Sequence, residues 1–138
     1  GRVYVCDREN SRMQIFSATG ELLNIWNVEG RPLDLAIDKD DNVFISVGRW
    51  AAGKRNLAGK MMAKTSEAHL LICDPEGKVL AKWGAANHGA LDSFVAPHGM
   101  CVDSRGNWYV VENGQRVLQR MGVSCPDYPS IRKYARVR

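Results

Sequence analysis

The sequence predicts an all-β fold of β-propeller type, built from a repeated unit of four short antiparallel strands. Two observations predict it. Runs such as VYVC, NVFISV, HLLIC and NWYVV are rich in β-branched and aromatic residues and are bounded by Asp, Asn and Gly, which form turns. The chain also resembles itself at long spacing, as propeller blades do. No segment has a convincing helical period, apart from part of residues 51–68.

The repeat is clearest in two pairs of segments. PLDLAID at residues 32–38 matches PHGMCVD at residues 97–103, and the match continues through a polar turn into a second strand. GELLNIW at residues 20–26 matches GKVLAKW at residues 77–83. One unit therefore opens with a strand that begins near Pro and ends in Asp. A second strand follows, a third ends in a turn with Gly, and the fourth ends in Trp.

In chain order these units give a partial blade at residues 1–30, a full blade at 31–94 and a last partial blade at 95–138. The full blade carries an insertion at residues 48–67 between its second and third strands. The last strand is expected near residues 130–137. This is about ten strands, or two and a half blades, whereas a closed ring needs roughly four to eight blades. We expect either a piece of a longer chain or one part of an oligomer, and residues 1–5, which already have a strand pattern, favour the piece.

Composition limits the partners. The 138 residues are 45% hydrophobic and 25% charged, which is typical of a soluble domain with a real core. No apolar run approaches the ~18 residues of a membrane span, so no membrane partner is expected. The net charge is +4, and the basic residues of the insertion are Arg49, Lys54, Arg55, Lys60 and Lys64. No nucleic-acid docking element accompanies them, so we expect a solvated loop and no nucleic acid.

The four cysteines do not form a recognisable site. Cys6, Cys73 and Cys101 follow or interrupt strand-like runs, where cysteine acts as a small buried apolar residue. No CxxC pair is present, which argues against a zinc ribbon or a thioredoxin-type site. Two disulfides could form, but the spacing does not demand them.

The stretches DRENSRMQIF, RPLDLAIDKDDNVF, DPEGKVLAKWG, APHGMCVDSRGNWYV and SIRKYARV resemble NHL-type propellers. More narrowly, they resemble the peptidylamidoglycolate lyase family, in its bacterial form. The resemblance covers nearly the whole chain outside the insertion. It implies a six-bladed propeller with zinc in its channel. It also implies a peptide or small-molecule substrate, a peptidyl- or acyl-α-hydroxyglycine, which is cleaved to an amide and glyoxylate. A secreted or periplasmic location is compatible with it, although the sequence does not fix the compartment.

By this resemblance His98 takes the position of the last zinc ligand, and Arg8 that of the arginine that flanks the substrate. Two further histidines and a tyrosine would lie before residue 1. Calcium is not expected, because Gly99 stands where the animal enzymes have an aspartate ligand. A disulfide of the animal enzymes is also missing, since Tyr4 and Ile15 occupy its positions.

Each of these residues also has a plainer interpretation. His98 could be a turn residue that caps a strand, and Arg8 could pair with Asp7 or Glu9. His69 heads an alternating strand and is expected to be structural. His88 lies in the loop WGAANHGALDSF, where it either faces solvent or lines the channel mouth.

Trp50 and the basic insertion either form a lid over the channel or belong to a disordered loop. The acidic stretch DKDDN at residues 38–42 is expected to be a β-turn. An EF-hand loop would need Gly and Glu where Val43 and Arg49 stand. DSRGN at residues 103–107 predicts the same turn, with Gly106 free to adopt positive φ.

Three hypotheses follow. The first is a fragment of a zinc lyase, inactive as the isolated chain. The second is a non-catalytic NHL propeller that binds protein or peptide. The third is a half-propeller that closes its ring as a homodimer.

Overall fold

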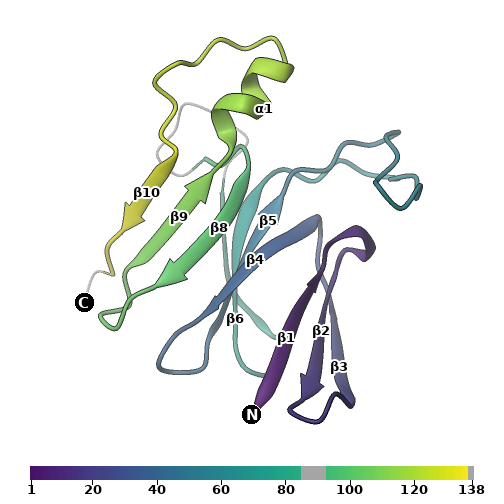
Figure 1. Cartoon of the computed structure of the whole chain (residues 1–138), viewed down its shortest axis with the longest axis vertical. Coiled ribbons are helices and arrows are strands. Elements are labelled where there is room, and N and C mark those ends of the chain that lie inside the picture. The colour runs from purple at the N-terminus through teal and green to yellow at the C-terminus, as the bar shows by residue number, and fades with distance from the viewer. Residues whose placement is uncertain (85–92, 137–138) are drawn as a thin grey trace.

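A computed structural model describes residues 1–84 and 93–136 of the chain (Figure 1). In this part of the chain every strand pairing is antiparallel. The elements in chain order are β1 (Arg2–Asp7), η1 (Arg8–Asn10), β2 (Arg12–Ser17), β3 (Leu22–Asn27), β4 (Arg31–Ile37), β5 (Val43–Gly48), β6 (His69–Cys73), β7 (Val79–Trp83), β8 (Pro97–Val102), β9 (Trp108–Glu112), α1 (Gly114–Arg120) and β10 (Ile131–Tyr134). The predicted all-β class is confirmed.

The strands form three sheets that stand side by side (Figure 1). We call them sheet 1 (β1-β2-β3), sheet 2 (β4-β5-β6-β7) and sheet 3 (β8-β9-β10). Sheet 2 lies between the other two and is the one with four strands. Strands β4 and β8 lie next to each other and run in the same direction (Figure 1).

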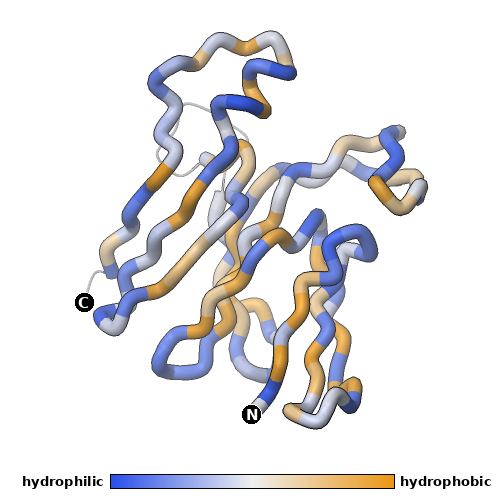
Figure 2. The backbone as a smooth tube through the Cα atoms, viewed as in Figure 1, coloured by the Kyte–Doolittle hydropathy of each residue, from blue (hydrophilic) through white to orange (hydrophobic). Residues whose placement is uncertain are grey.

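Two apolar layers, one on each face of sheet 2, form most of the core, and a smaller third cluster joins Val95, Leu118 and Tyr128. Alternation along β5 sends Val43, Ile45 and Val47 toward sheet 1, where they pack against Met13 and Ile15. Phe44 points the other way and packs against residues of sheet 3 such as Met100 and Val110. All six residues of β5 are therefore buried. In Figure 2 the hydrophobic colours follow the strands, and the hydrophilic ones gather at the turns.

The internal repeat is visible in the backbone. β4 has an irregular register between Pro32 and Asp34, and β8 has one between Pro97 and Gly99, at matching positions of the repeat. Both prolines are fully buried. The strand pairs that follow them are joined by turns of the same form.

The two polar turns are confirmed as β-turns. The backbone N–H of Asn42 donates to the Asp38 carboxylate at 2.9 Å, and that of Asn107 donates to Asp103 at 2.9 Å. Gly106 has φ 80°, as predicted, and Asp41 at the matching position has φ 61°. The aspartate side chain satisfies turn amides that would otherwise lack a partner.

Two expectations about local structure were wrong. The insertion contains no helix; it forms a narrow loop pinned by the isolated bridges Trp50↔Ser66 and Arg55↔Met61. The helix lies instead at α1, which lacks an amphipathic period because it is only two turns long. A close approach of the Tyr128 ring holds it, since a Cβ on Gly114 would lie 2.2 Å from that ring. Among the described residues no helix is long and apolar enough to cross a membrane.

The expectation for the cysteines holds for two of the three. Cys73 is buried and Cys6 is half-buried, but Cys101 is exposed because it lies on the outward face of sheet 3. All four thiols are free. Burial, and then the charge of Asp34, raise the pKa of Cys6 to about 11, so this thiol is protonated and unreactive at neutral pH.

Candidate functional site

Arg8 and His98 stand at the end of the sheets where β1 ends and where β4 and β8 begin (Figure 1). Arg8 is the first residue of η1, the single turn that joins β1 to β2. Its Nε donates to Oε1 of Glu9 at 2.9 Å, and its side chain is 36% exposed. This is the ion pair that the sequence offered as the plainer interpretation of Arg8. It engages Nε and leaves the two Nη groups at the edge of the guanidinium for a further partner.

Glu9 connects this turn to two distant parts of the chain. Its Oε1 also accepts a hydrogen bond from Arg31 at the start of β4. Its Oε2 accepts the backbone N–H of Leu57 at 3.0 Å, and its own carbonyl accepts Nδ2 of Asn56 at 2.8 Å. Partial burial by itself would raise the pKa of Glu9. The hydrogen bonds from Arg31 and Leu57 outweigh it and hold that pKa below its usual value.

The insertion is therefore docked, and its tip sits beside Arg8. Trp50, at its base, is only 5% exposed and lies under the guanidinium of Arg31, whose Cζ is 5.4 Å from the ring centroid. The indole thus anchors the insertion. The tip of the insertion, around Leu57, contacts the β1–β2 turn through Glu9, and Leu57 itself is 81% exposed.

His98 is the second residue of β8 and is exposed. It follows the buried Pro97 at the irregularity in the β8–β9 pairing. On the other side, Oδ2 of Asp34 in β4 accepts the backbone N–H of Met100 at 2.8 Å. The strand start that carries His98 is thus held between two sheets while its imidazole faces outward.

A buried carboxylate that sequence reasoning missed also fixes this segment. Glu112, at the end of β9, is 4% exposed and accepts the backbone N–H groups of Val95 at 2.8 Å and Ala96 at 3.2 Å. Tyr128 donates to the same carboxylate at 3.0 Å, and Nε of Arg132 lies 3.4 Å from it. Burial, and then the charge of Glu112, raise the pKa of Tyr128. The alternation of side chains between the two faces of β9 could have indicated that Glu112 is buried, because it puts Glu112 on the same face as Val110.

His69 heads β6, is 2% exposed and has Nδ1 2.8 Å from the carbonyl oxygen of Glu67. Burial lowers the pKa of His69, so the ring is neutral at pH 7. This environment suits the structural role expected for it. His88 lies outside the described residues.

The donor set for a metal is incomplete in the described residues, which contain no group of three or more His, Cys, Asp or Glu side chains able to hold one. His98 on its own does not fit zinc, which needs three protein ligands at a catalytic site. Two further ligands would have to come from outside this part of the chain.

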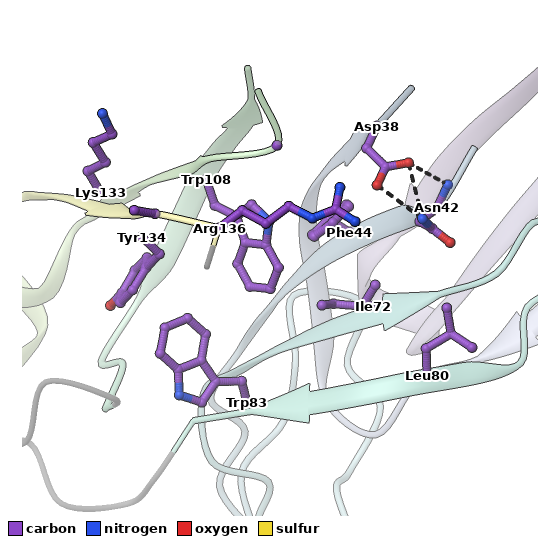
Figure 3. A pocket seen from close by; sticks show the side chains of 12 residues that line it. Asp38, Asn42, Phe44, Ile72, Leu80, Trp83, Trp108, Lys133, Tyr134 and Arg136 are labelled. Atoms are coloured by element: carbon purple, nitrogen blue, oxygen red, sulfur yellow. Dashed lines mark hydrogen bonds between the residues drawn. The ribbon is translucent and has the colours of Figure 1, made fainter. Parts of the chain in front are cut away.

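A cavity of about 480 Å³ lies elsewhere, between the outer strands of sheets 2 and 3 (Figure 3). Its walls include four aromatic rings, of which Trp83 and Tyr134 meet edge to face with centroids 4.3 Å apart. Polar groups at its rim include Asp38, Lys133 and Arg136. Of the expected site residues that the structure describes, Arg8, Trp50 and His98 do not line it.

No model of a known protein family matches the chain, and a search of curated proteins finds no match.

Proposed function

We propose that the three sheets are consecutive blades of an NHL-type propeller, and that the chain is part of a lyase of the peptidylamidoglycolate type. One observation carries the proposal: an exposed histidine stands at the start of the inner strand of sheet 3, at the end of the sheets that also holds Arg8. The sequence resemblance assigns these two residues to zinc and to substrate. Their position on one end of the sheets supports that assignment.

Arg8 is suited to bind the carboxylate of an α-hydroxyglycine. A guanidinium binds carboxylates through parallel N–H donors, and Glu9 occupies only Nε of Arg8. Glu9 also keeps the guanidinium in place, because it is itself tied to Arg31 and to the insertion. In this proposal Arg8 binds the substrate and Glu9 is a positioning residue.

Zinc cannot be assigned to this chain alone. His98 would be one of three ligands, and the other two would come from preceding blades. For this reason the isolated chain should release no glyoxylate at enzyme-like rates from an N-acyl-α-hydroxyglycine. Zinc-dependent release by the chain on its own would refute this part of the proposal.

The decisive experiment begins with the reading frame upstream of the codon for Gly1. We expect it to continue for about three blades, with two histidines at strand starts and a tyrosine near them. The longer protein should then release glyoxylate, and His98→Ala should lower kcat/KM at least about 100-fold, since losing a ligand should cost at least as much as the roughly 10–100-fold that outer-shell partners of metal ligands cost. His69→Gln is the matched control and should leave the zinc content unchanged. A longer protein without these histidines, or without activity, would exclude the lyase.

A second candidate is a binding module or homodimer, and the exposed faces of the two terminal sheets favour it. Val3 and Val5 on sheet 1 are 50% and 39% exposed, whereas Val43 and Ile45 on the corresponding strand of sheet 2 are 0% and 1% exposed. Sheet 3 exposes Val111 and Ile131 in the same way. Contiguous apolar faces of this kind are typical of surfaces that another element covers.

Sedimentation of the chain separates these cases. A mass near twice 15.4 kDa that falls to 15.4 kDa in the variant Val3→Lys would support a homodimer that uses this face. A dispersed monomer at high concentration would exclude it.

A further inference from the structure

Two long connections project from the same end of the molecule (Figure 1). The insertion joins β5 to β6, and a second connection, residues 113–130, joins β9 to β10. We call the second one the α1 loop, because it contains α1. β5 and β9 pair antiparallel with β4 and β8, so each connection leaves its sheet beside the first residues of β4 or β8. Both connections therefore lie at one end of the sheets.

The tip of the insertion is an ordered turn that exposes apolar side chains. The backbone N–H of Asn56 donates to the carbonyl of Lys60 at 3.0 Å, and that of Lys60 donates to Oδ1 of Asn56 at 2.6 Å. Glu9 holds the turn from the side by accepting the N–H of Leu57. The side chain of Leu57 is nevertheless 81% exposed, and that of Met61 is 50% exposed. A fixed backbone thus presents these two side chains to the outside.

The α1 loop has the same design. Its buried side chains Leu118 and Tyr128 attach it to sheet 3. The N–H of Val123 donates to the carbonyl of Leu118 at 3.0 Å, after Gly122, whose φ of 77° ends the helix. At this fixed corner Met121 and Val123 are each 44% exposed. Two separate tips at one end of the molecule therefore carry exposed aliphatic side chains.

Positive charge surrounds both tips. Every charged residue of the segment 49–66 is basic, and the exposed ones are Lys54, Arg55, Lys60 and Lys64. The α1 loop adds the exposed Arg116 and Arg120 against one acidic residue, Asp127. In the described part of the chain none of these six cations forms an ion pair.

The opposite end of the sheets has the opposite charge. Its turns have the sequences DKDDN at residues 38–42, DPEGK at 74–78 and DSRGN at 103–107, which together contain more acidic than basic residues. The described molecule is therefore polarised along its strands. A partner with a negative potential would attract the end that carries the two tips and repel the other.

The kind of side chain at the tips indicates which anionic partner fits. Proteins that bind single-stranded nucleic acid stack bases on exposed aromatic rings. The two aromatic residues of these connections, Trp50 and Tyr128, are each only 5% exposed. Aliphatic side chains surrounded by unpaired cations are instead typical of segments that bind the interface of a negatively charged bilayer.

We propose that this end of the molecule, through the tips of the insertion and of the α1 loop, binds the surface of an anionic membrane. Leu57 and Met121 enter the boundary between headgroups and acyl chains, while the lysines and arginines stay among the headgroups. The acidic turns face away from the bilayer. Such a surface contact needs no membrane-spanning segment. It is independent of zinc and of lyase activity, because it uses neither His98 nor Arg8.

The test is cosedimentation of the intact chain with sucrose-loaded vesicles of phosphatidylcholine that contain about 30% phosphatidylserine. We expect binding to these vesicles and none to pure phosphatidylcholine. Lys60→Glu should weaken binding at least about fivefold, since each cation near an anionic surface contributes about that factor. Lys78→Glu makes the same change of charge in a turn at the opposite end and should leave binding unchanged.

A second pair of variants tests the apolar contact. Leu57→Ser should weaken vesicle binding at least about fivefold, because a leucine side chain is withdrawn from the acyl boundary. Leu22→Ser is the control, since Leu22 is 47% exposed but stands at the opposite end of the sheets. Arg116→Glu should show that the α1 loop takes part, with a loss similar to that of Lys60→Glu.

Three results would overturn the proposal. The first is equal binding to neutral and anionic vesicles, or none to either at about 1 mM lipid. The second is an equal loss in Lys60→Glu and Lys78→Glu, or none in Leu57→Ser. The third is tighter binding to polyglutamate or to duplex DNA than to the vesicles, with an affinity that Leu57→Ser leaves unchanged. That result would assign the cations to an acidic macromolecule instead of a membrane.

Discussion

The carboxylate of Asp34 in β4 accepts the backbone N–H of Met100 in β8, with 2.8 Å between the two atoms. This bond joins the neighbouring strands of sheets 2 and 3 two residues after His98. Asp34 lies at the irregularity of β4, where its own N–H donates to the buried hydroxyl of Ser46 at 3.0 Å. Asp34 thus satisfies irregular backbone in both β4 and β8.

Asp34→Ala should lower the free energy of unfolding by about 1.5–3 kcal/mol, the usual loss for a hydrogen bond to a charged group. Asp34→Asn keeps a carbonyl acceptor and should lose less. Urea unfolding measures both. Asp40→Ala, in the exposed turn, is the control and should change the midpoint little. Equal midpoints for Asp34→Ala and the wild type would show that the bond does not join the sheets.

Glu112→Ala should be more destabilising, by about 3–5 kcal/mol, because it removes the buried carboxylate that faces the Arg132 guanidinium and accepts the backbone N–H groups of Val95 and Ala96. Tyr128→Phe removes one hydrogen bond to the same carboxylate and should lose about 1 kcal/mol. The double variant tests whether the two residues act together. If the losses in the free energy of unfolding of the two single variants sum to the loss in the double variant, Glu112 and Tyr128 do not form a shared cluster.

The docking of the insertion should depend on pH through Glu9. The folded-state pKa of Glu9 is lowered below the value of 4.5 for the unfolded chain. Its contribution is therefore fully present above pH 4.5 and is lost as pH falls through the folded pKa. The amide resonance of Leu57 and the fluorescence of Trp50 should report this release. In the Glu9→Gln variant, neither signal should change with pH over this range. If the variant titrates as the wild type does, Glu9 is not the group that controls the docking of the insertion.

The repeat, the strands and the turns could be predicted because each depends on local sequence. Alternating apolar and polar residues indicate the strands, and residues such as Asp38 and Gly106 indicate the turns. The contacts that position the candidate site could not. Glu9 binds Leu57 and Asn56 across almost fifty residues, and nothing in η1 marks that partner. Likewise α1 is held by Tyr128, so its position depends on tertiary packing and not on its own period.

Gly20 and Gly77 stand at the same place in the repeat. Comparing alanine substitutions at these two positions distinguishes the cost of close packing from the cost of backbone strain. Gly20 and Gly77 have φ 89° and 92°, so an alanine at either position would be strained to a similar degree, by about 1–2 kcal/mol. A Cβ at Gly20 meets nothing within 4 Å, whereas at Gly77 it would lie 2.4 Å from the Trp26 ring.

Gly77→Ala should therefore lower the free energy of unfolding by about 1–3 kcal/mol more than Gly20→Ala, since the ring must shift from a packed position. Urea unfolding measures the difference, and near-ultraviolet circular dichroism follows the displaced indole. If the two variants lose the same amount, the turn that contains Gly77 does not rest on Trp26.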